Sequence, residues 1–301
     1  MVPPRFSFSA LWMGFLFVLA WPLLCRGQLQ HSVEQALPGS AGTIVVVDVA
    51  SGKILAAKNL ELAAQELVRP GSTLKPFVLS VLLQKKRIDS KEKLVCRRPL
   101  WIGSLRMDCS HSNLVTQLNA EDAIAYSCNS YVAEVSLRLR PGELAEALRR
   151  VGLDSPTGLT KNEAMGRIER THTQEEIQLM ALGLRGIEVT PLELLMAYRN
   201  LALRKNEKGD GPPSEIFRGL EHAVAYGTAH ASNVDGWKVA GKTGTATSAP
   251  GSPTNGLFVG YAPADNPEIA IVVYLARSRG LDAAAVAQPV LSEYWQLKKK
   301  P

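Results

Sequence analysis

The sequence predicts an α/β (α+β) fold, in which one antiparallel five-stranded sheet is flanked by helices and carries an inserted, all-helical subdomain. Two observations lead to this prediction. Strand-like runs rich in β-branched residues lie near both ends of the chain, and helix-like segments with capping residues fill the middle. One sheet can therefore combine an N-terminal hairpin with a C-terminal meander, and the helical subdomain is expected at about residues 85–215.

The strands are predicted from short runs between turns. Near the N-terminus, the turn "ASGK" separates "TIVVVDV" from "ILAAKN", which is typical of a hairpin. Near the C-terminus, Gly- and Pro-rich turns separate "GWKVAGKTGTATS", "GLFVGYAP" and "EIAIVVYLAR". A last helix, at about residues 282–297, is expected to pack on one face of the sheet.

The helices are predicted from the residues at their ends. Asn119 is a good N-cap, and Thr190 followed by a proline supplies a cap and a favoured first residue. Gly152 is expected to end the amphipathic segment "PGELAEALRRVGL". The other predicted helices span residues 72–84, 119–127, 130–139, 173–185 and 190–205, and residues 204–215 form the clearest surface loop.

The N-terminal segment resembles an export signal. Arg5 precedes the almost uncharged run "FSFSALWMGFLFVLAWPLLC", and Cys25 and Gly27 are small residues placed where a signal peptidase cleaves. About 20 apolar residues span a bilayer, so the run fits either a cleaved signal peptide or a signal anchor. We therefore expect residues 1–27 to direct export, to hold the protein at the membrane surface if uncleaved, and to precede one domain at 28–301.

Composition and cysteines narrow the function. The chain has 46% hydrophobic residues and a formal net charge of +6, but its basic residues form no aromatic-interleaved cluster, so no nucleic-acid partner is expected. Cys96 and Cys109 flank a short segment and could close a disulfide in an oxidising compartment. Cys128, between Ser127 and Asn129, could be a free thiol. No Cys/His spacing resembles a metal site, so neither a metal nor another cofactor is expected.

The pattern Ser-x-x-Lys occurs twice, as Ser72 with Lys75 and as Ser90 with Lys93. The second copy lies in a charged stretch, where nothing would remove water from its lysine. Lys75 is followed by the apolar run "FVLSVLL", and residues i and i+3 share one face of a helix. If that face is buried, the pKa of Lys75 falls and the lysine can take a proton from Ser72.

Two further motifs have both functional and structural interpretations. Ser127 and Asn129, in "YSCNSY", fall at a break between two helices, where they could face a cleft or simply cap a helix. Lys242 to Thr245, "KTGT", lies on a predicted strand and could bind a carboxylate, with Gly244 allowing close approach. The alternative is a strand with a glycine bulge.

Taken together and in this order, the three motifs resemble those of penicillin-recognising serine acyltransferases, the superfamily of β-lactamases and penicillin-binding proteins. "PGSTLKPF" and "AIAYSCNSY" are similar almost word for word to segments of penicillin-binding transpeptidases. "TPLELLMAY", "AVAYGTA" and "LFVGYAP" are similar to three more of their segments. The resemblance covers about residues 40–296 and implies a β-lactamase/transpeptidase-like fold, class B-like but without a pedestal or glycosyltransferase domain.

The resemblance also implies a mechanism. Ser72 would attack the carbonyl of a D-Ala-D-Ala peptide bond and form an acyl-enzyme, with Lys75 as the base. Ser127 would relay a proton to the leaving nitrogen, and Lys242 would keep the local potential positive. Asn129 would bind an amide of the substrate.

The same resemblance places the substrate on the predicted strand. Thr243 and Thr245, on either side of Gly244, would hold the terminal carboxylate, and the backbone N–H groups of Ser72 and Thr245 would form the oxyanion hole. Transfer of the acyl group to an amine is transpeptidation, and transfer to water is carboxypeptidation. Peptidoglycan stem peptides would be substrates, β-lactams inhibitors and a glycosyltransferase a partner, in the periplasm or on the outer face of the cytoplasmic membrane.

Two other functions remain open from the sequence. A serine β-lactamase needs a group that activates water for deacylation, and Glu163 and Glu169 are candidates without a family pattern around them. A sensor or scaffold would bind β-lactams or muropeptides without turnover. The short segment 204–215 departs from the family and could alter the groove and the activity.

Overall fold

The computed structural model describes residues 26–39, 41–207, 211–247 and 252–299. The expected export segment lies outside these residues except for its last two, which begin a helix over residues 26–36. No helix within the described ranges is both long enough and apolar enough to cross a bilayer.

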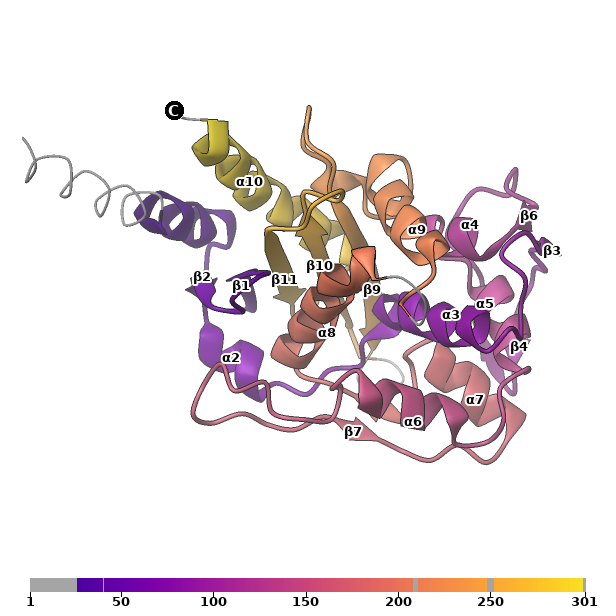
Figure 1. Ribbon diagram of the computed structural model, residues 1–301. Helices are drawn as coiled ribbons and strands as arrows, with labels where there is room; N and C mark the ends of the chain where they lie inside the picture. The colour runs from indigo at the N-terminus through magenta and orange to yellow at the C-terminus, as the bar shows by residue number, and fades with distance from the viewer. Residues whose placement is uncertain (1–25, 40, 208–210, 248–251, 300–301) are drawn as a thin grey trace, which may run out of the picture.

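A five-stranded antiparallel sheet forms the centre of the molecule (Figure 1). Its order is β2-β1-β11-β10-β9, so the N-terminal hairpin lies next to the last strand of the C-terminal meander, and β9 is an edge strand. This confirms the predicted sheet. The strands are β1 (Gly42–Asp48), β2 (Ile54–Lys58), β9 (Ala240–Thr247), β10 (Thr254–Ala262) and β11 (Ile269–Leu275).

Both faces of the sheet are covered. Along β1, Val45 and Val47 belong to one apolar core, whereas Ile44 and Val46 belong to the other, as the two-residue period of a strand requires. The first core contains the inner side of α8 (Pro191–Leu203). The second contains α10 (Gly280–Lys299), which confirms the helix predicted to close the chain.

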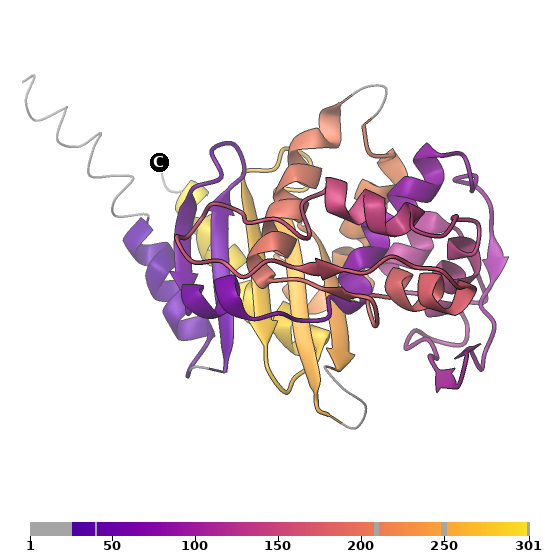
Figure 2. The ribbon, with the colours of Figure 1, turned by 90° about the horizontal axis from the view of Figure 1, so that it is seen from below.

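Most of the segment predicted as an all-helical subdomain, at about residues 85–215, lies beyond β9, at the side of the sheet away from the hairpin (Figure 2). The predicted bounds need correction, because α8 falls within them and packs on the sheet, and the segment also contains short strands. Two-residue strand pairs and 3₁₀ turns connect its helices. The remaining helices are α2 (Leu60–Gln65), α3 (Lys75–Gln84), α4 (Ala120–Ala125), α5 (Asn129–Ser136), α6 (Glu143–Arg150), α7 (Gln174–Ala181) and α9 (Ser214–Ala225). The short strands are β3 (Leu94–Val95), β4 (Trp101–Ile102), β5 (Leu105–Arg106), β6 (Gln117–Leu118), β7 (Arg167–Ile168) and β8 (Ile187–Glu188), and the 3₁₀ turns are η1 (Gly71–Leu74), η2 (Arg204–Asn206) and η3 (His230–Ser232).

The capping residues explain most helix starts. Asn119 and Thr190 cap α4 and α8 as predicted, and each forms a capping box with an acidic residue three positions later. The prediction for residues 72–84 needs correction, because the segment begins as η1 and becomes an α-helix only at Lys75. The short α2 was not predicted, since six residues give too little periodicity.

Helix α8 supports the turn that carries Ser72. The buried Tyr198 hydroxyl donates a hydrogen bond of 2.8 Å to the Thr73 carbonyl oxygen, and its ring packs edge-on against Phe77 with centroids 5.3 Å apart. The sequence motif "TPLELLMAY" therefore fixes the position of η1 through its tyrosine.

We expect Tyr198→Phe to lower the free energy of unfolding by about 1–2 kcal/mol, because the Thr73 carbonyl loses a buried donor. Urea denaturation followed by fluorescence would measure this loss as a shift in midpoint at constant slope. Tyr226→Phe is the matched control, because Tyr226 is 49% exposed, and it should leave the midpoint unchanged. Equal midpoints for wild type and Tyr198→Phe would contradict the role of this hydrogen bond.

Candidate active site

The turn η1 carries Ser72 between the edge strand β9 and a tight turn at Gly183. Gly71 has a φ of +55°, which favours glycine, and its N–H donates to the Gly183 carbonyl oxygen at 3.0 Å. A Cβ on Gly71 would lie 3.1 Å from the Thr245 carbonyl oxygen. A side chain at position 71 would therefore strain the backbone and crowd the contact between the Ser72 turn and β9.

Two more glycines complete this packing. A Cβ on Gly183 would overlap the backbone of Gly71, and Gly183 itself has a φ of +69°. A Cβ on Gly244 would lie 2.5 Å from the Pro70 carbonyl oxygen and 2.9 Å from the Thr73 methyl group. The sequence suggested that Gly244 admits a ligand, but in the structure its missing side chain makes room for the Ser72 turn.

Lys75 connects this turn to the second motif. Its backbone N–H donates to the Ser72 carbonyl oxygen, and its side chain is fully buried. The Nζ atom lies 2.7 Å from the Ser127 carbonyl oxygen, 3.3 Å from Ser127 Oγ and 2.6 Å from Asn129 Oδ1. The first two motifs thus meet at one amine.

Burial changes the acidity of this amine. Loss of hydration lowers the pKa of Lys75 from 10.5 to about 8, although the nearby thiols of Cys128 and Cys109 act in the opposite direction. A neutral Lys75 is therefore accessible near neutral pH. In contrast, Lys93 of the second Ser-x-x-Lys copy is exposed and lies outside any helix, as expected.

Ser127 and Asn129 lie at the break between α4 and α5. Ser127 has a φ of +55°, which is uncommon for a residue with a side chain and often marks functional sites. The Asn129 amide accepts from Lys75 and donates from Nδ2 to the carbonyl oxygens of Met107 (3.1 Å) and Asp108 (3.2 Å). Both ends of this amide are engaged within the protein.

The third motif faces the same region from β9. Lys242 is fully buried, and burial, followed by the charge of Lys75, holds its pKa well below the usual value. Its Nζ lies 3.1 Å from the Thr243 carbonyl oxygen and 3.4 Å from Thr228 Oγ1. Thr245 is exposed, and its Oγ1 accepts a 2.8 Å hydrogen bond from the N–H of Gly280 at the start of α10.

Thr228 is a site residue that the sequence reasoning did not select. Its hydroxyl lies 3.2 Å from Thr243 Oγ1, and its N–H donates to the Ala125 carbonyl oxygen at 3.1 Å, two residues before Ser127. Thr228 therefore bridges the Lys242 strand and the Ser127 loop. The similarity of "AVAYGTA" to a family segment was the available indication.

The cysteines differ from the prediction. Cys96, Cys109 and Cys128 are all free thiols, and the Cys96 and Cys109 sulfurs lie 3.6 Å apart, so the expected disulfide is not formed. Cys128 is free and buried, as expected. The three sulfurs gather with His111 into a group that could hold a metal ion. The sequence shows no metal-binding spacing for these four residues, because only the fold brings them together.

The candidate water-activating glutamates lie in different surroundings. Glu163 accepts from the backbone N–H groups of Thr157, Gly158 and Thr160, and these bonds, against the opposing effect of burial, lower its pKa. Its carboxylate is thus used to fold its own loop. Glu169 is exposed.

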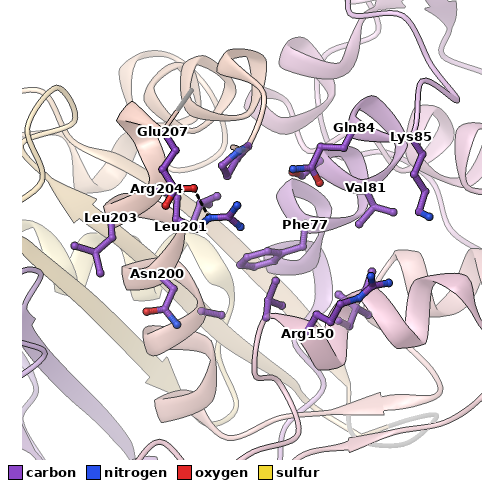
Figure 3. Close-up of a pocket in the computed structure, with 16 residues that line it drawn as sticks. Phe77, Val81, Gln84, Lys85, Arg150, Asn200, Leu201, Leu203, Arg204 and Glu207 are labelled. Atoms are coloured by element: carbon purple, nitrogen blue, oxygen red, sulfur yellow. Dashed lines mark hydrogen bonds and ion pairs between the residues drawn. The ribbon is translucent and has the colours of Figure 1, made fainter. Parts of the chain in front are cut away.

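A separate cavity lies behind α3. It has a volume of about 540 Å³ and is formed between α3, α6 and α8 (Figure 3). Phe77 and Val81 line it from α3, and Arg150 and Leu201 line it from α6 and α8. Arg204 lines it from η2, which follows α8. None of the motif residues lines this cavity, so it is distinct from the Ser72 site.

The sequence model for the penicillin-binding protein transpeptidase domain matches residues 42–295. The chain belongs to this family. The match covers all three motifs and the whole sheet, and it confirms the resemblance found in the sequence.

Individual relatives are distant. The chain is 26% identical to the probable peptidoglycan D,D-transpeptidase PenA of Neisseria gonorrhoeae, over 88% of this chain and 53% of that protein. It is 25% identical to the peptidoglycan D,D-transpeptidase FtsI of Buchnera aphidicola, over 86% of this chain and 53% of that protein. The chain thus spans about half the length of these curated relatives.

The fold agrees with solved transpeptidase domains. The apo transpeptidase domain of penicillin-binding protein 3 from Burkholderia pseudomallei superposes with a TM-score of 0.78 at 22% identity, covering 94% of this chain and 95% of that one. Penicillin-binding protein 2 of Pseudomonas aeruginosa gives a TM-score of 0.74 at 21% identity, covering 91% and 77%. This transpeptidase domain therefore has the predicted architecture.

Gly183→Ala should slow acylation of Ser72 by about 100-fold, because the new methyl group displaces the Gly71 backbone and misplaces the nucleophile. Stopped-flow acylation with a chromogenic β-lactam would measure this. Gly152→Ala is the matched control: it carries the same left-handed strain, with a φ of +84°, but has open space around its Cβ. If both variants acylate at the wild-type rate, Gly183 does not position Ser72.

Proposed function

We propose that this domain is a D,D-transpeptidase or D,D-carboxypeptidase that cleaves D-Ala-D-Ala stem peptides of peptidoglycan through an acyl-enzyme on Ser72. The observation that carries the proposal is the buried Lys75 amine, which has a lowered pKa, lies one turn after Ser72 and contacts Ser127. A neutral amine at this position can serve as the base for a serine. The names of the curated relatives support the same activity.

The proton path follows from these contacts. Lys75 accepts the proton of Ser72 as the hydroxyl attacks the substrate carbonyl. As the C–N bond breaks, the Ser127 hydroxyl gives its proton to the leaving nitrogen and takes the proton held by Lys75 Nζ, which lies 3.3 Å away. Lys242 acts from the opposite side, although its lowered pKa makes it a weaker source of positive potential than the sequence suggested. The main role of Asn129 is to orient Lys75 through its Oδ1 atom. Its Nδ2 atom can bind a substrate amide only if it releases the carbonyl oxygens of Met107 and Asp108.

The substrate is proposed to lie along β9. This strand is at the edge of the sheet, so an extended peptide can pair with it. The exposed Thr245 hydroxyl, together with Thr243, is suited to bind the terminal carboxylate. The main chain of Thr245 lies against the Ser72 turn, which supports an oxyanion hole formed by the N–H groups of Ser72 and Thr245.

The alternatives have less support. A serine β-lactamase needs a group that activates water for deacylation. Of the two candidate glutamates, Glu163 accepts hydrogen bonds from its own loop and Glu169 is exposed. A sensor or scaffold would acylate without releasing product. Action on peptidoglycan requires an extracytoplasmic location, so we propose export to the periplasm or the outer membrane face, where β-lactams inhibit the protein and a glycosyltransferase supplies its glycan strands.

Ser72→Ala should abolish covalent labelling by fluorescent penicillin and the release of D-Ala from a stem pentapeptide, with or without an acceptor amine. Ser90→Ala, in the copy of the motif whose Lys93 is exposed, is the matched control and should label normally. Labelling that persists in Ser72→Ala would remove Ser72 as nucleophile. Labelling without D-Ala release would favour the sensor, and β-lactam hydrolysis at many turnovers per second would favour the β-lactamase.

The acylation rate should rise with pH and level off above about pH 8. Lys75 reacts as the neutral amine, and with a pKa of about 8 roughly a tenth of it is neutral at pH 7. Acid conditions protonate Lys75, so acylation falls about tenfold per pH unit below the midpoint. Second-order acylation rates measured from pH 6 to 10 would test this, and a flat profile would contradict Lys75 as the base.

A further inference from the structure

Three sulfurs and one imidazole nitrogen form a compact group behind the second motif. The Sγ–Sγ distances are 3.6 Å from Cys96 to Cys109, 3.6 Å from Cys109 to Cys128 and 3.7 Å from Cys128 to Cys96. His111 Nε2 lies 3.6 Å from the Cys96 sulfur, and all four atoms lie within 4.8 Å of one another. Cys109, His111 and Cys128 are buried.

The three S–S distances and the distance from Cys96 Sγ to His111 Nε2 match edges of a tetrahedron around Zn²⁺. With Zn–S bonds of about 2.3 Å and a Zn–N bond of about 2.05 Å, tetrahedral geometry requires S–S edges of about 3.8 Å and an S–N edge of about 3.6 Å. A disulfide would instead need two of the sulfurs at about 2.05 Å and would leave the third sulfur outside the bond. The nearly equal spacing of three sulfurs favours one ion shared among them.

The surroundings suit bound thiolates and a ligating histidine. The Cys109 sulfur accepts from the N–H groups of Asn129 (3.2 Å) and Ser130 (3.4 Å), and the Cys128 sulfur accepts from that of Tyr131 (3.4 Å). His111 Nδ1 lies 3.0 Å from the Ser112 carbonyl oxygen. A proton on Nδ1 would be held there, and Nε2 can bind a metal once the Arg98 NH2 group, 3.2 Å from Nε2, moves away from it.

Charge is balanced by one arginine. Three thiolates, a neutral imidazole and Zn²⁺ carry a net charge of −1, and Arg98 lies beside them. Its NH2 donates to the His111 carbonyl oxygen at 2.8 Å, and its guanidinium interacts with the Cys96 side chain. The same NH2 group is 2.8 Å from His111 Nδ1. If Nδ1 carries a proton, both groups are donors, so the Arg98 guanidinium must move away from Nδ1.

We propose that Cys96, Cys109, His111 and Cys128 bind one Zn²⁺ ion in a closed, structural site. Three thiolates and one imidazole are a donor set that suits Zn²⁺, and four protein ligands leave no position for a substrate. The ion joins the segment 96–111 to the start of α5.

This site would position the catalytic loop. Cys128 stands between Ser127 and Asn129, so a metal bond to its sulfur restrains the residues on both sides of it. The two N–H groups that bind the Cys109 sulfur belong to Asn129 and Ser130. The ion would thus restrain Ser127 and Asn129, whose oxygen atoms accept hydrogen bonds from Lys75, and it would not contact substrate.

The test is the metal content of the full-length chain, purified in detergent without chelator. Mass spectrometry of the metals should find about one zinc per chain in wild type and less than about a tenth of this in Cys109→Ser and His111→Ala. Cys25→Ser and His172→Ala, the latter at an exposed histidine, are matched controls and should keep their zinc. Cobalt exchanged into wild type should show thiolate-to-metal charge-transfer absorption and tetrahedral d–d bands.

Other outcomes overturn the proposal. A metal-free wild type in which Cys96, Cys109 and Cys128 are all alkylated would do so, as would a Cys96–Cys109 disulfide found by peptide mapping, or zinc retained by the ligand variants. If the ligand variants do not fold, chelation of wild type decides: it should expose three thiols and lower the Tm, and an unchanged thiol count would refute the site.

The metal content is read without substrate, so this proposal does not depend on the proposed function. Its positioning role has a separate readout. Chelated wild type that remains folded should acylate about tenfold more slowly, with recovery on adding zinc, because Ser127 and Asn129 lose their restraint. Full acylation by the zinc-free protein would refute the positioning role.

Discussion

The site depends on keeping the Lys75 amine out of water. A fall in pKa from 10.5 to about 8 corresponds to about 3 kcal/mol against the charged form, and the folded protein must supply this. It does so by surrounding the amine with packed elements and offering three oxygen acceptors at fixed positions. Lys242 is buried on the neighbouring strand, so two amines share one poorly hydrated region and each disfavours a charge on the other.

Close backbone packing makes that burial geometrically feasible. Gly71, Gly183 and Gly244 let a turn, a loop and an edge strand approach to distances that any side chain would prevent. The Tyr198 hydroxyl then fixes the turn from the side of α8. The helical subdomain and the sheet are consequently held together at the nucleophile itself, and the reactive groups from three distant segments need little adjustment to meet.

Much of this arrangement could be predicted from the sequence. Alternating β-branched runs predicted the strands, and caps such as Asn119 and Thr190 predicted the helices, because these signals are local. The three motifs, at Ser72, Ser127 and Lys242, were assigned to one site through a family resemblance. The thiol cluster was missed because its members come from positions that only tertiary packing brings together, and Thr228 because a threonine has no distinctive local pattern.

The open edge of β9 also has a cost for the solution behaviour of the protein. An edge strand presents unpaired N–H and C=O groups that can pair with any extended chain, including another molecule of the same protein. The Arg69 guanidinium binds the Thr247 carbonyl oxygen at 3.1 Å and places a positive charge at the end of this strand. A charge at the edge of a sheet discourages self-pairing. The open edge that leaves room for a ligand therefore carries a risk of aggregation, and Arg69 helps to limit that risk.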